Sequence, residues 1–234
     1  MSGIGGLNET ELHEQLKHLY AGDDGTTERG VEGFVVDVVR GDELVEIQSR
    51  GFAKLRRKIT TLAGHYRLRI VHPIAAETLI TKLSDTGELV SSRRSPRKGR
   101  AEEVFRELTS IADLLPHPAV TVDVVLVRAV ETRVEDGRGS WRRHGVSIVA
   151  RRLGEVVETR AFVSASDYLG ALPPELGSRF TNGDLMDATG LSYRDAQPMT
   201  SALRKMGLLR LVDKRGREQV YEISTRLRPR RLAR

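Results

Sequence analysis

The chain has 234 residues, no cysteine and a formal net charge of +6. The lack of cysteine excludes disulfides, a cysteine-ligated zinc site and a thiol nucleophile. The first residues, MSGIGGLNETEL, have neither the basic nor the apolar region of a signal peptide, and no apolar run reaches the length of about 18 residues needed to span a membrane. We therefore expect a soluble cytoplasmic protein with no membrane partner.

The positive charge is concentrated in the C-terminal part of the chain. From Leu169 onward there are 13 Lys and Arg residues against 7 Asp and Glu residues, so this part carries the whole net charge. A basic segment of this kind indicates a polyanionic partner, with DNA the leading candidate. The last ten residues, TRLRPRRLAR, can equally be a disordered basic tail that serves solubility.

The N-terminal third alternates between helical and strand-like patterns. Residues 8–20 have leucines at helical spacing, and the segment GDDGTTERG that follows is predicted to be a loop. Two strand-like runs, GFVVDVV and LVEI, flank a Gly-Asp turn. The segment FAKLRRKITTLA returns to helical spacing, and RLRIVHPIA is a further strand. The order helix, strand, strand, helix, strand favours an α/β core with a mixed sheet.

The middle of the chain is less regular. SSRRSPRKGR is predicted to be a basic loop, RAEEVFRELTSIADLL a helix, and VTVDVVLVRAVETRV and VSIVARRLGEVVETRAFV two long strands. Residues 86–168 either complete the first sheet or form a separate layer. Trp141, the only tryptophan, is expected in the core at the start of a strand, and its alternative role is to stack on nucleic acid. Pro and Gly in LGALPPELGS predict a linker over residues 169–178.

The predicted hairpin places two carboxylates side by side. If its strands pair about the Gly-Asp turn, Asp37 lies opposite Glu46, with Cβ atoms roughly 5 Å apart. Gln48 shares the face of Glu46 because side chains alternate with period two along a strand. Like charges in this position destabilise a sheet, and Mg²⁺ held by the two carboxylates and a substrate phosphate would offset the repulsion. The alternative is a hairpin whose polar face meets water.

The pattern of Asp37, a turn and then Glu46-x-Gln48 resembles the PD-(D/E)XK nuclease superfamily, whose fold also begins with a helix and places a helix after the second strand. The resemblance implies a restriction-endonuclease-like mixed sheet with flanking helices. It also implies that Asp37 and Glu46 hold Mg²⁺ or Mn²⁺. In the family a lysine at the third position orients or activates the attacking water.

Gln48 stands where the family's motif has lysine, a substitution that several nucleases of the superfamily tolerate. Lys54 or Lys58, on the helix that follows, are candidates to supply the missing cation. Glu11 or Glu14 on the first helix match an acidic residue that some members add to the metal site.

The C-terminal segment FTNGDLMDATGLSYRDAQPMTSALRKMGLLRLVDKRGREQVYEIS divides into helix, turn, helix and two strands around a basic turn. Asn182 is expected to cap the first helix, Gly190 to form the turn, Leu191 to fill the core and Gly207 to end the second helix. This order resembles winged helix-turn-helix domains. Pro198 falls inside the second helix, where it would kink or delay the helix. Dimerisation or internal docking is the alternative use of such a domain.

The winged-helix resemblance implies that the second helix enters a DNA groove and that the basic turn contacts the backbone. The basic loop at residues 91–100 could also clamp DNA, or could equally be solvated. The residues expected to bind nucleic acid are Tyr193, Arg194, Gln197, Arg204 and Lys205 on the helix, Lys214, Arg215 and Arg217 on the turn, and Arg94, Arg97 and Lys98 on the loop.

We therefore expect a metal-dependent nuclease that acts on DNA. Its predicted parts are a nuclease-like α/β domain (1–168), a linker (169–178), a winged helix (179–224) and a basic tail (225–234). One alternative is a non-catalytic winged-helix DNA-binding protein with a degenerate nuclease fold and a regulatory or chromosomal role. In either case a homodimer is a possible assembly. Another alternative is a protein-interaction module of a larger defence or repair complex. The layout also resembles uncharacterised bacterial proteins.

Overall fold

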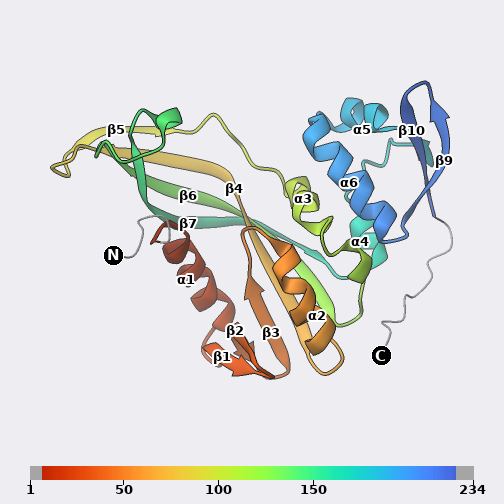
Figure 1. Cartoon of the computed structure of the whole chain (residues 1–234), viewed down its shortest axis with the longest axis horizontal. Coiled ribbons are helices and arrows are strands. Elements are labelled where there is room, and N and C mark those ends of the chain that lie inside the picture. Colours follow the sequence, from red (N-terminus) through yellow and green to blue (C-terminus); the bar gives the residue numbers. More distant parts are fainter. Residues whose placement is uncertain (1–6, 225–234) are drawn as a thin grey trace.

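The computed structural model describes residues 7–224 (Figure 1). The predicted basic tail lies outside the described residues. Short 3-10 turns cover Phe52–Leu55, Ala101–Val104, Ala112–Leu114 and Trp141–Arg143. The helices and strands are α1 (Leu7–Ala21), β1 (Thr26–Val31), β2 (Phe34–Arg40), β3 (Glu43–Ile47), α2 (Arg56–Leu62), β4 (Arg67–Leu83), β5 (Leu89–Arg94), α3 (Phe105–Leu108), β6 (Val120–Val134), β7 (Ser147–Phe162), α4 (Ala165–Leu169), β8 (Arg179–Phe180), α5 (Asn182–Thr189), α6 (Tyr193–Lys205), β9 (Leu209–Arg215) and β10 (Glu218–Ile223).

The main feature is a seven-stranded mixed sheet in the order β1-β2-β3-β4-β6-β7, with β5 also paired to β4. Strands β3, β4 and β6 are parallel to one another, and the remaining neighbours are antiparallel. A second, antiparallel sheet of three strands, β8-β10-β9, lies in the C-terminal part. The predicted α/β class with a mixed sheet and flanking helices is confirmed.

Three predicted elements are wrong in detail. The expected loop GDDGTTERG contains β1, and the first half of the expected loop SSRRSPRKGR is β5. Both strands are almost fully exposed along their length, so no apolar alternation marks them in the sequence. The expected helix over RAEEVFRELTSIADLL is broken after α3, where the hydroxyls of Thr109 and Ser110 donate to the carbonyls of Arg106 (2.7 Å) and Glu107 (2.8 Å). Such local bonds compete with helix continuation.

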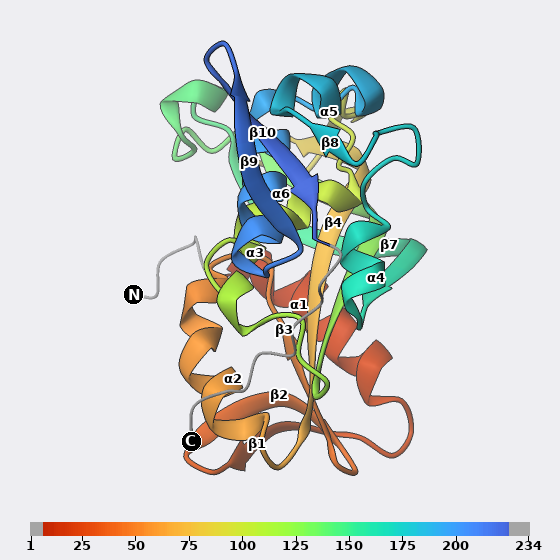
Figure 2. The same cartoon turned by 90° about the vertical axis from the view of Figure 1, so that its right-hand side faces the viewer.

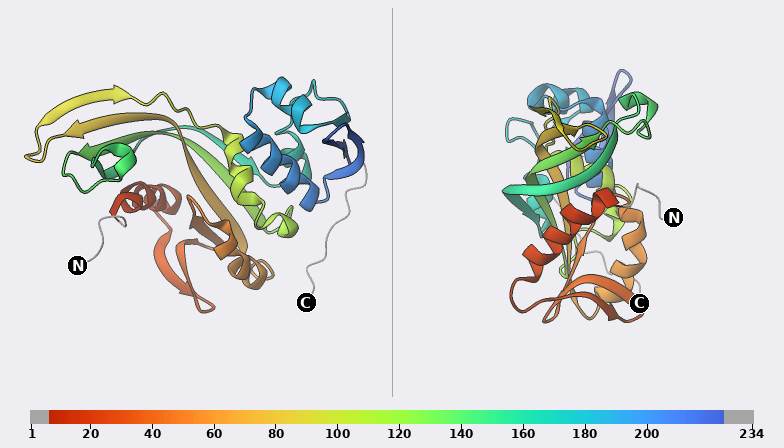
Figure 3. Two further views of the ribbon diagram at one scale, coloured as in Figure 1. Left: turned by 45° about the horizontal axis from the view of Figure 1, so that its top comes forward. Right: turned by 90° about the vertical axis from the view of Figure 1, so that its left-hand side faces the viewer.

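Strand β4 is the longest in the fold and organises the main sheet. Its first residues pair with β3, its last residues pair with β5 on the same side, and β6 follows it along the other side. Residues 86–168 therefore complete the first sheet and do not form a separate layer. Beyond β3 the long strands curve away as an arch above α1 (Figures 1 and 3).

Pro73 lies in the stretch of β4 between its partners β3 and β5, where a missing backbone donor interrupts no ladder on that side. The chain at Gly99 closes this gap, because its N–H donates to the Ala75 carbonyl at 3.0 Å. A Cβ at Gly99 would lie 2.5 Å from Ile74 Cγ2 and 2.6 Å from the Ala75 carbonyl oxygen, so this approach requires glycine.

Helices cover both faces of the sheet. Leu44 and Val45 are neighbours on β3 and so point to opposite sides. Leu44 belongs to the cluster that contains Ile59 of α2, whereas Val45 belongs to the cluster that contains Leu16 of α1. Strand β3 is thus buried on both faces, which accounts for its continuous burial, Glu43 and Glu46 included.

The C-terminal part has the predicted order of helix, turn, helix and hairpin (Figure 2). The N-cap of α5 is Thr181, one residue before the predicted Asn182, and its hydroxyl accepts the Asp184 N–H at 3.1 Å. Gly190 adopts a φ of +67° at the end of α5, and Leu191 is buried as predicted. Helix α6 runs unbroken through Pro198, so the expected kink does not interrupt it.

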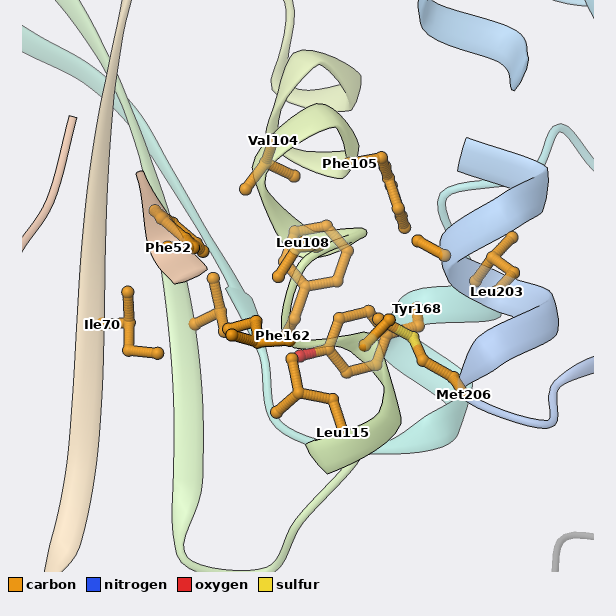
Figure 4. Packing of buried hydrophobic residues seen from close by; sticks show 14 of the residues in the cluster. Phe52, Ile70, Val104, Phe105, Leu108, Leu115, Phe162, Tyr168, Leu203 and Met206 are labelled. Carbon is orange, nitrogen blue, oxygen red and sulfur yellow. The ribbon is translucent and has the colours of Figure 1, made fainter. Parts of the chain in front are cut away.

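The two parts of the chain share one core. Phe105 and Leu108 of the α3 region pack in the same cluster as Leu203 and Met206 at the end of α6, with Tyr168 between them (Figure 4). The segment 169–178 is not a free linker, since its Leu172 is buried in that cluster. Ion pairing adds to the apolar contact where Arg106 bonds to the buried carboxylate of Asp195. No helix among the described residues is long and apolar enough to cross a membrane.

Candidate functional site

The two carboxylates expected to act together lie on neighbouring strands of the central sheet. The paired register of β2 and β3 ends with Val38 opposite Val45, and Asp37 and Glu46 are the next residues along the two strands. Their side chains are 20% and 11% exposed, respectively. The charge of Asp37 helps to raise the pKa of Glu46, so the two groups are near each other, but Asp37 contacts α1 and Glu46 contacts α2, helices that cover opposite faces of the sheet.

Each carboxylate is accompanied by a cationic or donor group of the protein. The Lys58 ammonium, on α2, contacts the Glu46 carboxylate and donates to the Val35 carbonyl at 2.7 Å. Asp37 Oδ2 accepts the Ile47 N–H at 2.8 Å, and His13 Nε2 of α1 lies 3.2 Å from the same oxygen. Within the described part of the chain, no group of three or more His, Asp or Glu side chains has an arrangement that could hold a metal ion.

The two carboxylates have oppositely perturbed acidities. Burial raises the pKa of Glu46, and Lys58 offsets only part of that rise. Burial also acts to raise the pKa of Asp37, but His13 and the Ile47 amide together lower it below its usual value. A pair with separated acidities suits two different roles, one as an anion and one that exchanges a proton more readily.

Of the two lysines considered for the missing cation, Lys58 contacts one carboxylate, that of Glu46. Lys54 is exposed, with its side chain near Gly51. The side-chain amide of Gln48 donates to the Arg50 backbone carbonyl rather than to Glu46. The backbone carbonyl of Gln48 accepts from Nδ1 of the buried His72 at 2.8 Å. The motif glutamine thus shapes the turn after β3.

The helical glutamates predicted as metal ligands have other partners. Glu11 accepts from Arg152 of β7 at 2.6 Å, and Glu14 accepts from Lys17 at 2.6 Å. Lys17 also donates to Glu28 of β1 at 2.8 Å. His13 occupies the position beside Asp37 instead. No spacing in the sequence marks this histidine, because its partner is 24 residues away on another element.

A cleft of about 650 Å³ is lined by His13 and Ile47, both of which contact Asp37, and by Arg194 of α6. The carboxylates themselves do not line it. We call this space the arginine cleft. The sequence did not reveal it because the lining arginines come from segments far apart in the chain: Arg50, Arg97, Arg106, Arg133, Arg143, Arg151 and Arg194.

Most residues predicted to bind nucleic acid are exposed. Lys205 donates to the Thr109 carbonyl at 2.8 Å, Arg215 donates to Asp184 at 3.1 Å, and Arg97 donates to Glu103 at 2.9 Å. The remaining predicted residues, all exposed, are Tyr193, Arg194, Gln197 and Arg204 on α6, Lys214 and Arg217 on the β9–β10 hairpin, and Arg94 and Lys98 on β5 and the following loop.

Trp141 is not in the core, contrary to the prediction. It lies in the turn between β6 and β7, is 81% exposed, and has the Arg142 guanidinium 5.5 Å from its ring centroid. The stacking role considered as the alternative remains open to it.

Comparison with known proteins gives a family and a distant relative. An uncharacterized protein of Treponema pallidum (strain Nichols) is 29% identical over 220 residues, which cover 93% of this chain and 86% of that protein. No solved structure matches the chain. A family model described as "Domain of unknown function (DUF8091)" matches residues 10–163, from α1 to the end of β7. The chain belongs to this family.

Proposed function

We propose that the protein is a metal-dependent nuclease that binds and hydrolyses DNA. The observation that carries the proposal is that Asp37 and Glu46 lie on neighbouring strands of the central sheet, with the Lys58 ammonium in contact with Glu46. Two carboxylates and one ammonium are the groups that the PD-(D/E)XK resemblance requires. The helix α2 supplies the lysine that the motif itself lacks.

Asp37 and Glu46 fit a divalent cation because both are oxygen donors on rigid strands, and Mg²⁺ is held by one or two carboxylates plus substrate oxygens. When bound, such an ion polarises a phosphodiester and lowers the pKa of water. Lys58 then holds positive charge beside Glu46, where it can orient a water molecule and stabilise negative charge on the phosphate. His13 covers Asp37 and has to move aside for an ion to bind.

We further propose that β8, α5, α6 and the β9–β10 hairpin act as a winged helix. Support comes from the order of elements and from the exposed stripe of Tyr193, Arg194 and Gln197 along α6. The opposite side of α6 packs against α3, so this helix is available to DNA on one side only. Arg194 also lines the arginine cleft, whose lining includes His13 beside Asp37.

Plasmid nicking in Mg²⁺ or Mn²⁺ tests the proposal. Wild type is expected to nick, while Asp37→Asn and Glu46→Gln, which keep side-chain size, are expected to lose activity and still bind DNA. Asp42→Asn is the matched control, because Asp42 is an exposed carboxylate in the turn of the same hairpin. A wild type that binds DNA but cuts neither plasmid nor single-stranded DNA under either metal would refute the catalytic part.

A non-catalytic DNA-binding role is the second candidate. It is favoured by the fact that Lys58 and His13 already accompany the two carboxylates, so the fold does not need a cation to be stable. Thermal unfolding separates the two proposals: a nuclease predicts a rise in Tm with Mn²⁺ that Asp37→Asn abolishes, because only the folded state binds the ion. The non-catalytic protein shows no such rise.

A further inference from the structure

The arginine cleft carries more positive charge than its own acidic residues can balance. Seven arginines and three glutamates line it, and no lysine does. Arginine, with a planar fork of donors, is the residue best suited to bind phosphate oxygens in pairs. The composition of the cleft therefore indicates a phosphate-bearing ligand.

Among the described residues, the ion pairs inside the cleft leave three arginines without an acidic partner, and one of them, Arg143, donates to the Val146 carbonyl at 3.2 Å. Glu103 accepts from Arg97 and Arg106. In the same way, the buried Glu131 bonds to both Arg133 and Arg151.

The third glutamate, Glu107, accepts the backbone N–H of Gly51 at 2.7 Å and so holds the turn after β3. Among the described residues, neither Arg50 nor Arg194 forms an ion pair. Both are exposed, and they lie far apart in the sequence. Their charge is free for a ligand.

The size of the cleft limits the form of that ligand. Its volume of about 650 Å³ lies within the range of roughly 300–1,000 Å³ that encloses a drug-sized molecule, about one or two nucleotides. A duplex cannot enter such a space, but an unpaired strand can. Single-strand sites commonly combine a positive groove with an aromatic ring on which a base stacks. The turn that supplies Arg143 to the cleft also presents the exposed ring of Trp141.

We propose that the arginine cleft binds an unpaired nucleic-acid strand, with its phosphates on Arg50 and Arg194 and one base stacked on Trp141. The inference rests on the proposed function and narrows its substrate to DNA or RNA with a single-stranded segment. His13 and Ile47 line the cleft and contact Asp37, so a strand in the cleft would lie beside residues that cover this carboxylate.

Intrinsic fluorescence gives a direct test because Trp141 is the only tryptophan in the chain. We expect a dT oligonucleotide or a rU oligonucleotide to quench it at saturation, and a blunt hairpin duplex of equal charge to leave it unchanged. The comparison of dT with rU tells whether the strand is DNA or RNA. Binding is measured separately by fluorescence anisotropy of labelled oligonucleotides, without metal, so that cleavage plays no part.

Arg50→Gln with Arg194→Gln is expected to weaken single-strand binding about 10-fold or more and to lower the salt slope by about 1.4, since each single-strand phosphate contact contributes about 0.7. Trp141→Ala is expected to weaken it by about 5- to 100-fold, and Trp141→Phe much less. The matched control is Arg29→Gln, an exposed arginine on β1 that does not line the cleft.

No quenching by the strand, or equal effects of the cleft and control substitutions on single-strand affinity, would each overturn the inference. Its failure is separable from that of the nuclease proposal. Asp37→Asn and Glu46→Gln are expected to retain single-strand affinity, so loss of nicking with intact binding touches only the catalytic proposal.

Discussion

Removal of the Lys58 ammonium is expected to make the stability of the protein strongly dependent on pH. In Lys58→Met the Glu46 carboxylate, 11% exposed, loses its cationic partner. Breaking a buried pair in this way costs about 3–5 kcal/mol if the remaining charge persists. The carboxyl can instead take up a proton, and from an ordinary pKa of about 4.3 that costs about 3.7 kcal/mol at pH 7 but only about 1 kcal/mol at pH 5.

The sign follows from proton binding. Burial already raises the pKa of Glu46 in the folded state, and loss of Lys58 raises it further. The folded variant then binds more protons than the unfolded chain, so its stability falls as pH rises. We expect a loss of about 3–4 kcal/mol relative to wild type at pH 7 and of about 1 kcal/mol at pH 5.

Urea unfolding of both proteins at the two pH values measures this difference. The double variant Lys58→Met, Glu46→Gln is expected to remove the added pH dependence, because no titrating group remains at the site. Arg67→Met is the matched control: its pair with Asp42 is about two-thirds exposed on both sides, and its loss should cost less than about 1 kcal/mol at either pH. An equal loss for Lys58→Met at pH 5 and pH 7 would show that Glu46 is not the buried partner described.

Other substitutions probe the remaining contacts. Phe105→Ala, at a fully buried position between the two parts, is expected to cost about 3–5 kcal/mol and to lower the stability of both in one calorimetric transition; two separate transitions would contradict a shared core. Arg106→Met leaves Asp195 buried without its cation, and should increase proteolysis between residues 169 and 178 more than Arg97→Met does. Burial acts to raise the pKa of Glu131, but Arg151 and Arg133 together lower it below its usual value. The ionised Glu131 therefore stabilises the fold, and this contribution is lost as pH falls below about 4.3. Glu131→Gln should make the free energy of unfolding less dependent on pH in this acid range.

The parts of the fold that the sequence predicted are those with a strong apolar pattern. The long strands β6 and β7 and the two C-terminal helices have clear periodicity, and the structure matches them. The exposed edge strands β1 and β5 were missed because their pairing depends on backbone bonds to a neighbour, which leave no trace in side-chain pattern.

The candidate site shows the same division. Register arithmetic predicted that Asp37 and Glu46 share one face, but the paired register ends at Val38 and Val45, and the two carboxylates contact helices on opposite faces of the sheet. The contacts of Lys58 and His13 with these carboxylates depend on how two helices pack, and Lys58 was one of two candidates only. The arginine cleft could not be foreseen, since it requires the arch of the sheet and α6 to be placed in space.

The core shared through Phe105 and Met206 has a consequence for any substrate that spans the molecule. Because α6 is held against α3 by buried side chains, the distance from Arg194 to Asp37 is fixed by the fold rather than by a tether. A strand anchored at α6 would therefore reach the carboxylates with the phosphate that lies a constant number of nucleotides from the anchor. On the proposed nuclease function, the products would have one defined length, measured from the anchored end.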